Sequence, residues 1–189
     1  MGLWNLLWGR RAPDVSRTYT ALVAAARALP LYEAGAPDTL DGRFDMLVLH
    51  LHLVLRRLRV LGQDNSPESH RFAQALFDHF FQNMDETLRE MGVGDTSVGK
   101  RIRKMAQAYY GRAKAYDIAL SGALSASSPD QIDKVAVVLA RNLYPDCAPD
   151  SHTPPSLARL ATYIISFEAG LGVCSLAQIS AGSVPNISP

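Results

Sequence analysis

The stretch 47–55, with the sequence LVLHLHLVL, decides the fold of this chain because it fits two kinds of secondary structure. Its apolar residues alternate with period two, which is typical of a strand. However, leucine, a good helix former, occupies every odd position, and the run passes without a turn residue into an arginine-rich segment, 56–59. The whole segment 38–61 is also far longer than a typical strand. We therefore predict a helix that is apolar on nearly every side and forms the central, most buried element.

Helix signals on both sides of this segment predict an all-α fold. Ser66-Pro67-Glu68 and Ser128-Pro129-Asp130-Gln131 each place a capping residue and a proline at a helix start, and the second has the pattern of a complete capping box. Pro30 is expected to end the first helix. Apolar periodicity and these boundaries predict helices over residues 14–29, 38–61, 66–91, 95–124, 128–143 and 154–170.

These segments predict one domain, a bundle of six to seven helices over residues 14–171. Residues 1–13 form an apolar and basic tail, and residues 172–189, rich in Ser, Gly and Pro, are expected to be loose. In the first tail, Trp4 and Trp8 precede two arginines, which fits either contact with a lipid interface or packing on the domain. The longest uncharged apolar run, 46–55, is about half of a membrane crossing, so no segment is expected to span a bilayer.

The composition is that of a globular protein and argues against a disordered chain. The 189 residues are 48% hydrophobic and 20% charged, with a formal net charge of +1, which is ordinary for a globular domain. This charge gives no general attraction to nucleic acid or acidic lipid, so an electrostatic argument must be local.

Sequence signatures of catalysis and metal binding are absent. His50 and His52 project about 200° apart on a helix and cannot share one metal there, whereas on a strand they could. His79 lies among phenylalanines and is interpreted, like these two, as a partly buried core histidine. We therefore predict no enzyme, no cofactor and no metal; an enzyme using one of the three histidines is the alternative.

The segments 66–91 and 95–124 differ in charge. The first carries Asp78, Asp85, Glu86 and Glu90, and the second carries Lys100, Arg101, Arg103, Lys104, Arg112 and Lys114. Joined by a short turn, the two helices are expected to lie antiparallel so that some opposite charges meet. The remaining cations form a local positive surface, which is either a solvated face or a docking surface for RNA or lipid headgroups.

Aromatic residues on this pair of helices exceed what one core stripe needs. Phe77, Phe81 and Tyr110 lie beside the predicted core positions. Core packing is the ordinary role of aromatics at helical spacing, and a groove for an apolar client helix is the alternative. Our hypothesis is that these three aromatics form a client-binding surface with a basic rim, Arg101 and Lys104.

Three blocks of the chain resemble the ubiquinol–cytochrome c chaperone family. They are 38–45 (DTLDGRFD) continuing to Leu58, 74–85 (QALFDHFFQNMD) continuing to Asp95, and 98–105 (VGKRIRKM) followed by Tyr109, Tyr110, Gly111, Arg112 and Tyr116. Together the blocks cover roughly residues 31–124, and their order and density are specific.

The resemblance implies a helical assembly chaperone, without catalytic residues, that holds newly made cytochrome b for the respiratory cytochrome bc complex. Mitochondrial members work with a small partner subunit at the ribosomal tunnel exit and carry targeting extensions. This chain begins almost directly at the domain, so we expect a bacterial member, cytoplasmic or peripheral on the cytoplasmic face of the inner membrane. The small partner subunit and the ribosome contact stay open. The alternative is a membrane-associated or RNA-binding helical module without a dedicated cytochrome client.

Overall fold

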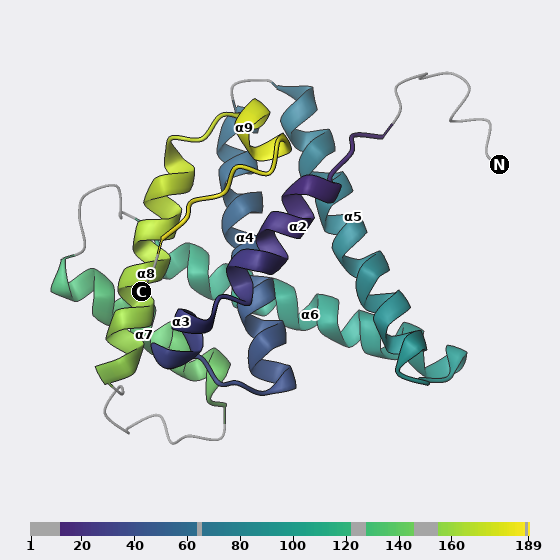
Figure 1. Ribbon diagram of the computed structural model, residues 1–189, viewed down its shortest axis with the longest axis horizontal. Helices are drawn as coiled ribbons and strands as arrows, with labels where there is room; N and C mark the ends of the chain where they lie inside the picture. The colour runs from purple at the N-terminus through teal and green to yellow at the C-terminus, as the bar shows by residue number, and fades with distance from the viewer. Residues whose placement is uncertain (1–11, 64–65, 122–127, 146–154, 188) are drawn as a thin grey trace.

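The computed structural model describes residues 12–63, 66–121, 128–145, 155–187 and 189, and every regular element in these ranges is a helix (Figure 1). Six helices are longer than ten residues, and α3 and α9 have five residues each. The bounds are α2 Ser16–Ala26, α3 Leu29–Glu33, α4 Leu40–Gln63, α5 Pro67–Glu90, α6 Asp95–Ala119, α7 Pro129–Leu143, α8 Pro155–Gly172 and α9 Leu176–Ser180. The predicted all-α bundle is confirmed.

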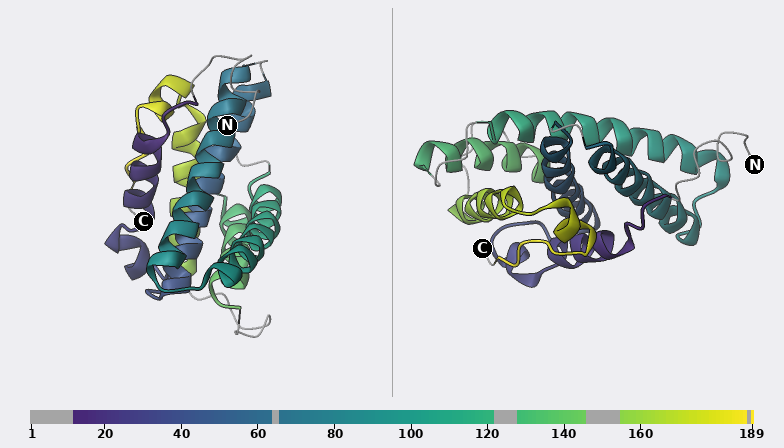
Figure 2. Two further views of the ribbon diagram at one scale, coloured as in Figure 1. Left: turned by 90° about the vertical axis from the view of Figure 1, so that its right-hand side faces the viewer. Right: turned by 90° about the horizontal axis from the view of Figure 1, so that it is seen from above.

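The central element is α4, as its sequence predicts. Residues 45–55 are all buried, and the helix packs against α2, α5, α6, α7 and α8. Seen from above, α4 lies between a layer of α6 and α7 on one side and α2 and α8 on the other (Figure 2). The period-two alternation therefore does not mark a strand: a helix surrounded by others needs apolar residues at nearly every position.

The first helix ends earlier than the sequence predicts. α2 stops at Ala26, and Pro30 lies in the first turn of a separate short helix, α3. A proline that would interrupt a helix fits the first turn of the next one equally well, because the missing N–H has no partner there. The prediction that one helix runs from residue 14 to residue 29 is wrong for this reason.

α5 and α6 meet at a tight turn and then diverge (Figures 1 and 2). Gly92 follows α5 with a φ of 80°, the left-handed conformation that commonly ends a helix. Among the described residues, the ion pair between these helices joins Arg89 of α5 to Asp95 of α6, beside the turn. The expected contact of α5 carboxylates with α6 cations does not form there, because the helices separate after their first turns.

Only half of the capping box predicted at the start of α7 forms. The Ser128 side chain does accept from the Gln131 backbone N–H, but the Gln131 amide donates to the carbonyl of Ala119 in α6. A complete capping box instead opens α9, between Ser175 and Gln178.

The segment after α8 packs on the bundle. Ile179 of α9 is fully buried, and its carbonyl accepts a hydrogen bond from the Thr18 hydroxyl of α2 at 2.6 Å. Gly170 faces Pro185, whose ring approaches closely enough that any side chain at position 170 would displace it. Within the segment 172–189, which was expected to be loose, Ile179 thus contacts α2 and Pro185 contacts α8.

Candidate functional site

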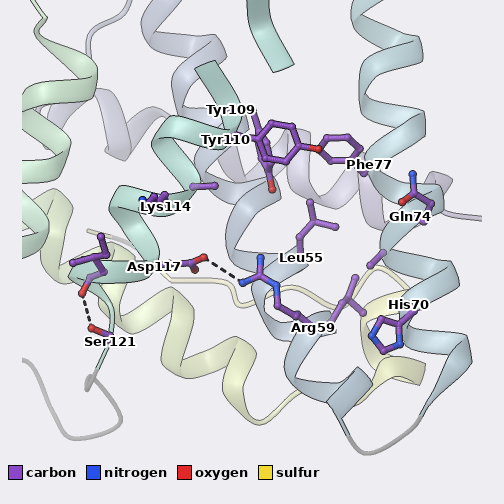
Figure 3. Close-up of a pocket in the computed structure, with 14 residues that line it drawn as sticks. Leu55, Arg59, His70, Gln74, Phe77, Tyr109, Tyr110, Lys114, Asp117 and Ser121 are labelled. Carbon is purple, nitrogen blue, oxygen red and sulfur yellow. Dashed lines mark hydrogen bonds and ion pairs between the residues drawn. The ribbon is translucent and has the colours of Figure 1, made fainter. Parts of the chain in front are cut away.

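A cleft of about 730 Å³ opens between α4, α5 and α6, where α5 and α6 diverge (Figure 3). Its apolar floor consists of Leu55 and Leu58 from α4, Ala73 from α5 and Ala113 from α6. The two leucines are extensions of the buried leucine run, so the same segment that fixes the core also provides this floor. A volume of this size fits a small ligand or a few side chains of a partner.

Aromatic rings line one side of the cleft. The Phe77 ring lies 5.2 Å from that of Tyr109 and 6.2 Å from that of Tyr110, measured between centroids, and the two tyrosine rings are 5.4 Å apart. Phe81 lies behind Phe77, with centroids 4.8 Å apart, and is not part of the lining. The structure thus brings the three sequence-predicted aromatics together and adds Tyr109.

These rings differ in exposure. Phe77 and Phe81 are half-buried and pack on the core, while Tyr110 is 62% exposed. Tyr109 is buried, and burial raises the pKa of its hydroxyl far above the usual range. Tyr110 is therefore the ring of this cluster that a partner can reach without displacing the core.

An ion-pair network closes the opposite side of the cleft. Asp117 of α6 accepts hydrogen bonds from His52 at 3.1 Å, Arg56 at 2.9 Å and Arg59 at 3.2 Å. Arg56 also donates to Glu168 of α8 at 2.6 Å. Burial alone would raise the pKa of Asp117, but the hydrogen bonds from Arg56 and Arg59 and the positive charge of Arg59 lower it overall. Asp117 is therefore held as a carboxylate.

His50 and His52 face different helices, as expected for residues two apart on a helix. His50 Nδ1 lies 2.7 Å from the carbonyl of Met46, which only accepts, so Nε2 accepts from the Tyr163 hydroxyl of α8, also at 2.7 Å. His52 points toward α6, where its Nε2 donates to Asp117. Burial lowers the pKa of each imidazole to about 4. Both are neutral near pH 7 and make hydrogen bonds between helices in the core.

The predicted basic rim lies elsewhere. Arg101 and Lys104 are exposed on the first half of α6 and do not line the cleft. The cleft is lined instead by Arg59 and Lys114, together with His70. The sequence contained a signal for Lys114: it follows Tyr110 by one helical turn, so the two share a face. Tyr109 and Asp117 were not predicted, because their roles depend on the direction in which α6 leaves the turn.

In the described ranges, no helix has the length and apolar character needed to cross a membrane, and no three or more His, Cys, Asp or Glu side chains gather as metal ligands do. Trp4 and Trp8, for which contact with lipid and packing on the domain were both left open, lie outside the described residues.

Comparisons with known proteins agree with this architecture. The sequence model described as "Ubiquinol-cytochrome C chaperone" matches residues 33–185, about four fifths of the chain. The crystal structure of the Cbp3 homolog from Brucella abortus is similar, with 34% identity and a TM-score of 0.73, over 92% of this chain and 88% of that one. No curated protein matches the chain. Because the family match spans well over half of the sequence, the chain belongs to the ubiquinol–cytochrome c chaperone family.

Proposed function

We propose that this protein is an assembly chaperone for the respiratory cytochrome bc complex and that its client is newly made cytochrome b. Family membership supports the role in assembly. The observation that carries the proposal at the level of residues is the cleft between α4, α5 and α6, with its apolar floor and its exposed Tyr110. A chaperone of a membrane protein needs such a surface, because its client exposes apolar side chains before assembly.

The cleft receives one face of a client helix rather than the whole helix. An α-helix with its side chains is about 10–12 Å across, whereas a cavity of about 730 Å³ has the size of a small-ligand site. Apolar side chains spaced by three or four residues on the client would enter the cleft, as in other helix-in-groove complexes. Phe77 and Tyr110 would contact their flanks, and Lys114 would meet polar groups at the edge.

Site-specific photo-crosslinking tests this proposal directly. A photoreactive amino acid replaces Tyr110 in the full chain, expressed in a respiring cell, and the crosslinked proteins are identified. Leu29 on α3, 67% exposed, is the matched control position because it is also a large exposed apolar residue outside the cleft. We expect a crosslink to cytochrome b from position 110 and none from position 29. Equal labelling from both positions, or no cytochrome b at either, would contradict the proposal.

Alanine substitutions then measure what each ring contributes. Tyr110→Ala should leave the melting temperature unchanged and lower the affinity for a cytochrome b transmembrane peptide about tenfold, as for a partly exposed aromatic anchor. Phe77→Ala and Phe81→Ala each remove a ring that packs on the core, so each is first tested for a change in melting temperature. If Phe81→Ala mainly unfolds the domain, Phe81 is a core residue. If folded Tyr110→Ala binds the peptide normally, the client surface is elsewhere.

A further inference from the structure

The first half of α6 carries a group of cations that the fold does not neutralise. Lys100, Arg101, Arg103 and Lys104 are all exposed, and the ion pairs of the described residues include none of them. Arg103 donates a hydrogen bond to the carbonyl of Gly99, within the same helix. Between Asp95 and Asp117 α6 has no acidic residue. The formal charge of the whole chain is only +1, so positive charge is concentrated on this helix.

Most of these cations share a face with exposed apolar residues. Lys100, Lys104, Lys114 and Ile118 lie along one stripe at helical spacing, and Arg103 and Tyr110 flank it on the same side. Ile118 is 66% exposed and Tyr110 is 62% exposed. At a rise of about 1.5 Å per residue, the stripe extends roughly 27 Å. We call these six residues the α6 stripe.

The α6 stripe is open to a large partner. Figure 2 shows α6 running straight along one side of the molecule, with α4 and α5 on its inner side and α7 beside its C-terminal end. The stripe residues are exposed or line the outer edge of the cleft. A flat partner can therefore contact cations and apolar side chains along the helix at the same time.

We propose that the α6 stripe docks this protein on the surface of an anionic lipid bilayer. Lysines and arginines on one face of a helix are attracted to acidic headgroups, and exposed tyrosine and isoleucine side chains fit the boundary between headgroups and acyl chains. RNA would satisfy the cations through its phosphates, but it offers no apolar environment to Ile118. This proposal rests on the charge and exposure of α6 and does not require that the cleft binds cytochrome b.

Docking by this stripe also positions the cleft. Tyr110, Lys114 and Ile118 belong both to the stripe and to the lining of the cleft. A molecule that lies on a bilayer through α6 therefore holds the opening of the cleft beside the membrane, where a transmembrane client leaves or enters the lipid.

Vesicle flotation of the purified full chain tests the docking surface. The vesicles consist of phosphatidylcholine alone or of phosphatidylcholine mixed with phosphatidylglycerol, at low and at high salt. We expect binding to the anionic vesicles only, and release by salt. Each basic residue at an anionic surface strengthens partitioning about fivefold, so Lys100→Glu/Lys104→Glu should weaken it at least about twentyfold. The control is Arg17→Glu/Arg27→Glu, which changes the net charge by the same amount as the α6 double variant. Arg17 is exposed on α2, and Arg27 is exposed at the C-terminal end of that helix. This variant should bind the vesicles like the original chain.

Three outcomes would overturn the proposal. The original chain could fail to float with anionic vesicles. The two double variants could lose binding equally, which would indicate a non-specific effect of net charge. Binding could also persist in Lys100→Glu/Lys104→Glu and vanish in Trp4→Ala/Trp8→Ala, which would assign the contact to the N-terminal segment. A chain that ignores anionic vesicles but binds an RNA oligonucleotide through Lys100 and Lys104 would have a nucleic-acid surface instead.

Discussion

His50 lies wholly inside the bundle, where it links α4 to α8 through the Tyr163 hydroxyl. His52, almost as deeply buried, links α4 to Asp117 of α6. Each ring satisfies a hydrogen bond that an apolar residue could not make, and each is kept neutral by burial. Protonation of either histidine at low pH should therefore weaken the packing of α4 against its neighbours.

The free energy of unfolding is expected to fall as the pH drops from about 6.5 toward 4. The pKa of His50 is lowered from 6.5 to about 4 in the folded protein, so the unfolded chain binds more protons across this range. One pKa unit corresponds to about 1.4 kcal/mol, so full titration of His50 would withdraw about 3 kcal/mol. Asp45 acts in the opposite sense, because burial raises its pKa from 3.8 to about 6 despite the nearby Arg112. Urea denaturation from pH 7 to pH 5 measures the net change in the free energy of unfolding that these groups cause.

His50→Gln isolates the contribution of this histidine. The variant should be less stable at pH 7, since the ring packing against Phe167 is lost, but its stability should fall less steeply between pH 6.5 and pH 5. His70→Gln, which replaces an exposed histidine outside the core, is the matched control. An unchanged slope in His50→Gln would mean that other groups cause the acid sensitivity.

At the scale of the element, patterns within one helix were predictable and relations between helices were not. Leucine content and length identified α4, whose observed bounds lie within two residues of the predicted ones. The divergence of α5 and α6 depends on how each packs against α4, and no local pattern encodes it. Phe77, Phe81 and Tyr110 were therefore identified from their positions beside the core stripe of each helix, whereas the Asp117 network and the actual cations of the cleft were missed.

Two glycines near the α5–α6 turn should respond to alanine with opposite signs. Gly92 has a φ of 80°, where alanine is strained, although its side chain would meet no atom within 4 Å. Gly92→Ala should therefore destabilise the fold by about 1 kcal/mol. Gly99 lies inside α6 and its added side chain would also meet nothing within 4 Å, so Gly99→Ala should stabilise by about 0.5–1 kcal/mol. Thermal unfolding distinguishes the two, and the same sign for both would contradict the assigned turn.

At the scale of the whole molecule, Arg56 connects its own helix, α4, to both α6 and α8. It extends from α4 to Asp117 on α6 and to Glu168 on α8, and its Nη2 also donates to the carbonyl of Leu120 at 3.3 Å. The side chain is 24% exposed, and its two carboxylate partners are 31% and 21% exposed. The network therefore lies at the border of the core, under the polar side of the cleft, and connects the layer of α6 to α8.

Arg56→Met tests whether this connection holds the layers together. The substitution keeps an apolar stem but leaves Glu168 without its cationic partner, while Asp117 retains His52 and Arg59. A partly buried charge that loses its partner should cost about 2 kcal/mol of stability. Arg43→Met, which removes an exposed ion pair with Asp38, is the matched control and should change stability little. Hydrogen exchange adds a spatial readout: Arg56→Met should lower the protection of α8 and of the C-terminal half of α6 more than that of α5. If the two variants are equally stable, or if protection falls evenly in every helix, the Arg56 network does not hold the layers together. The contacts of apolar residues along α4 then do so.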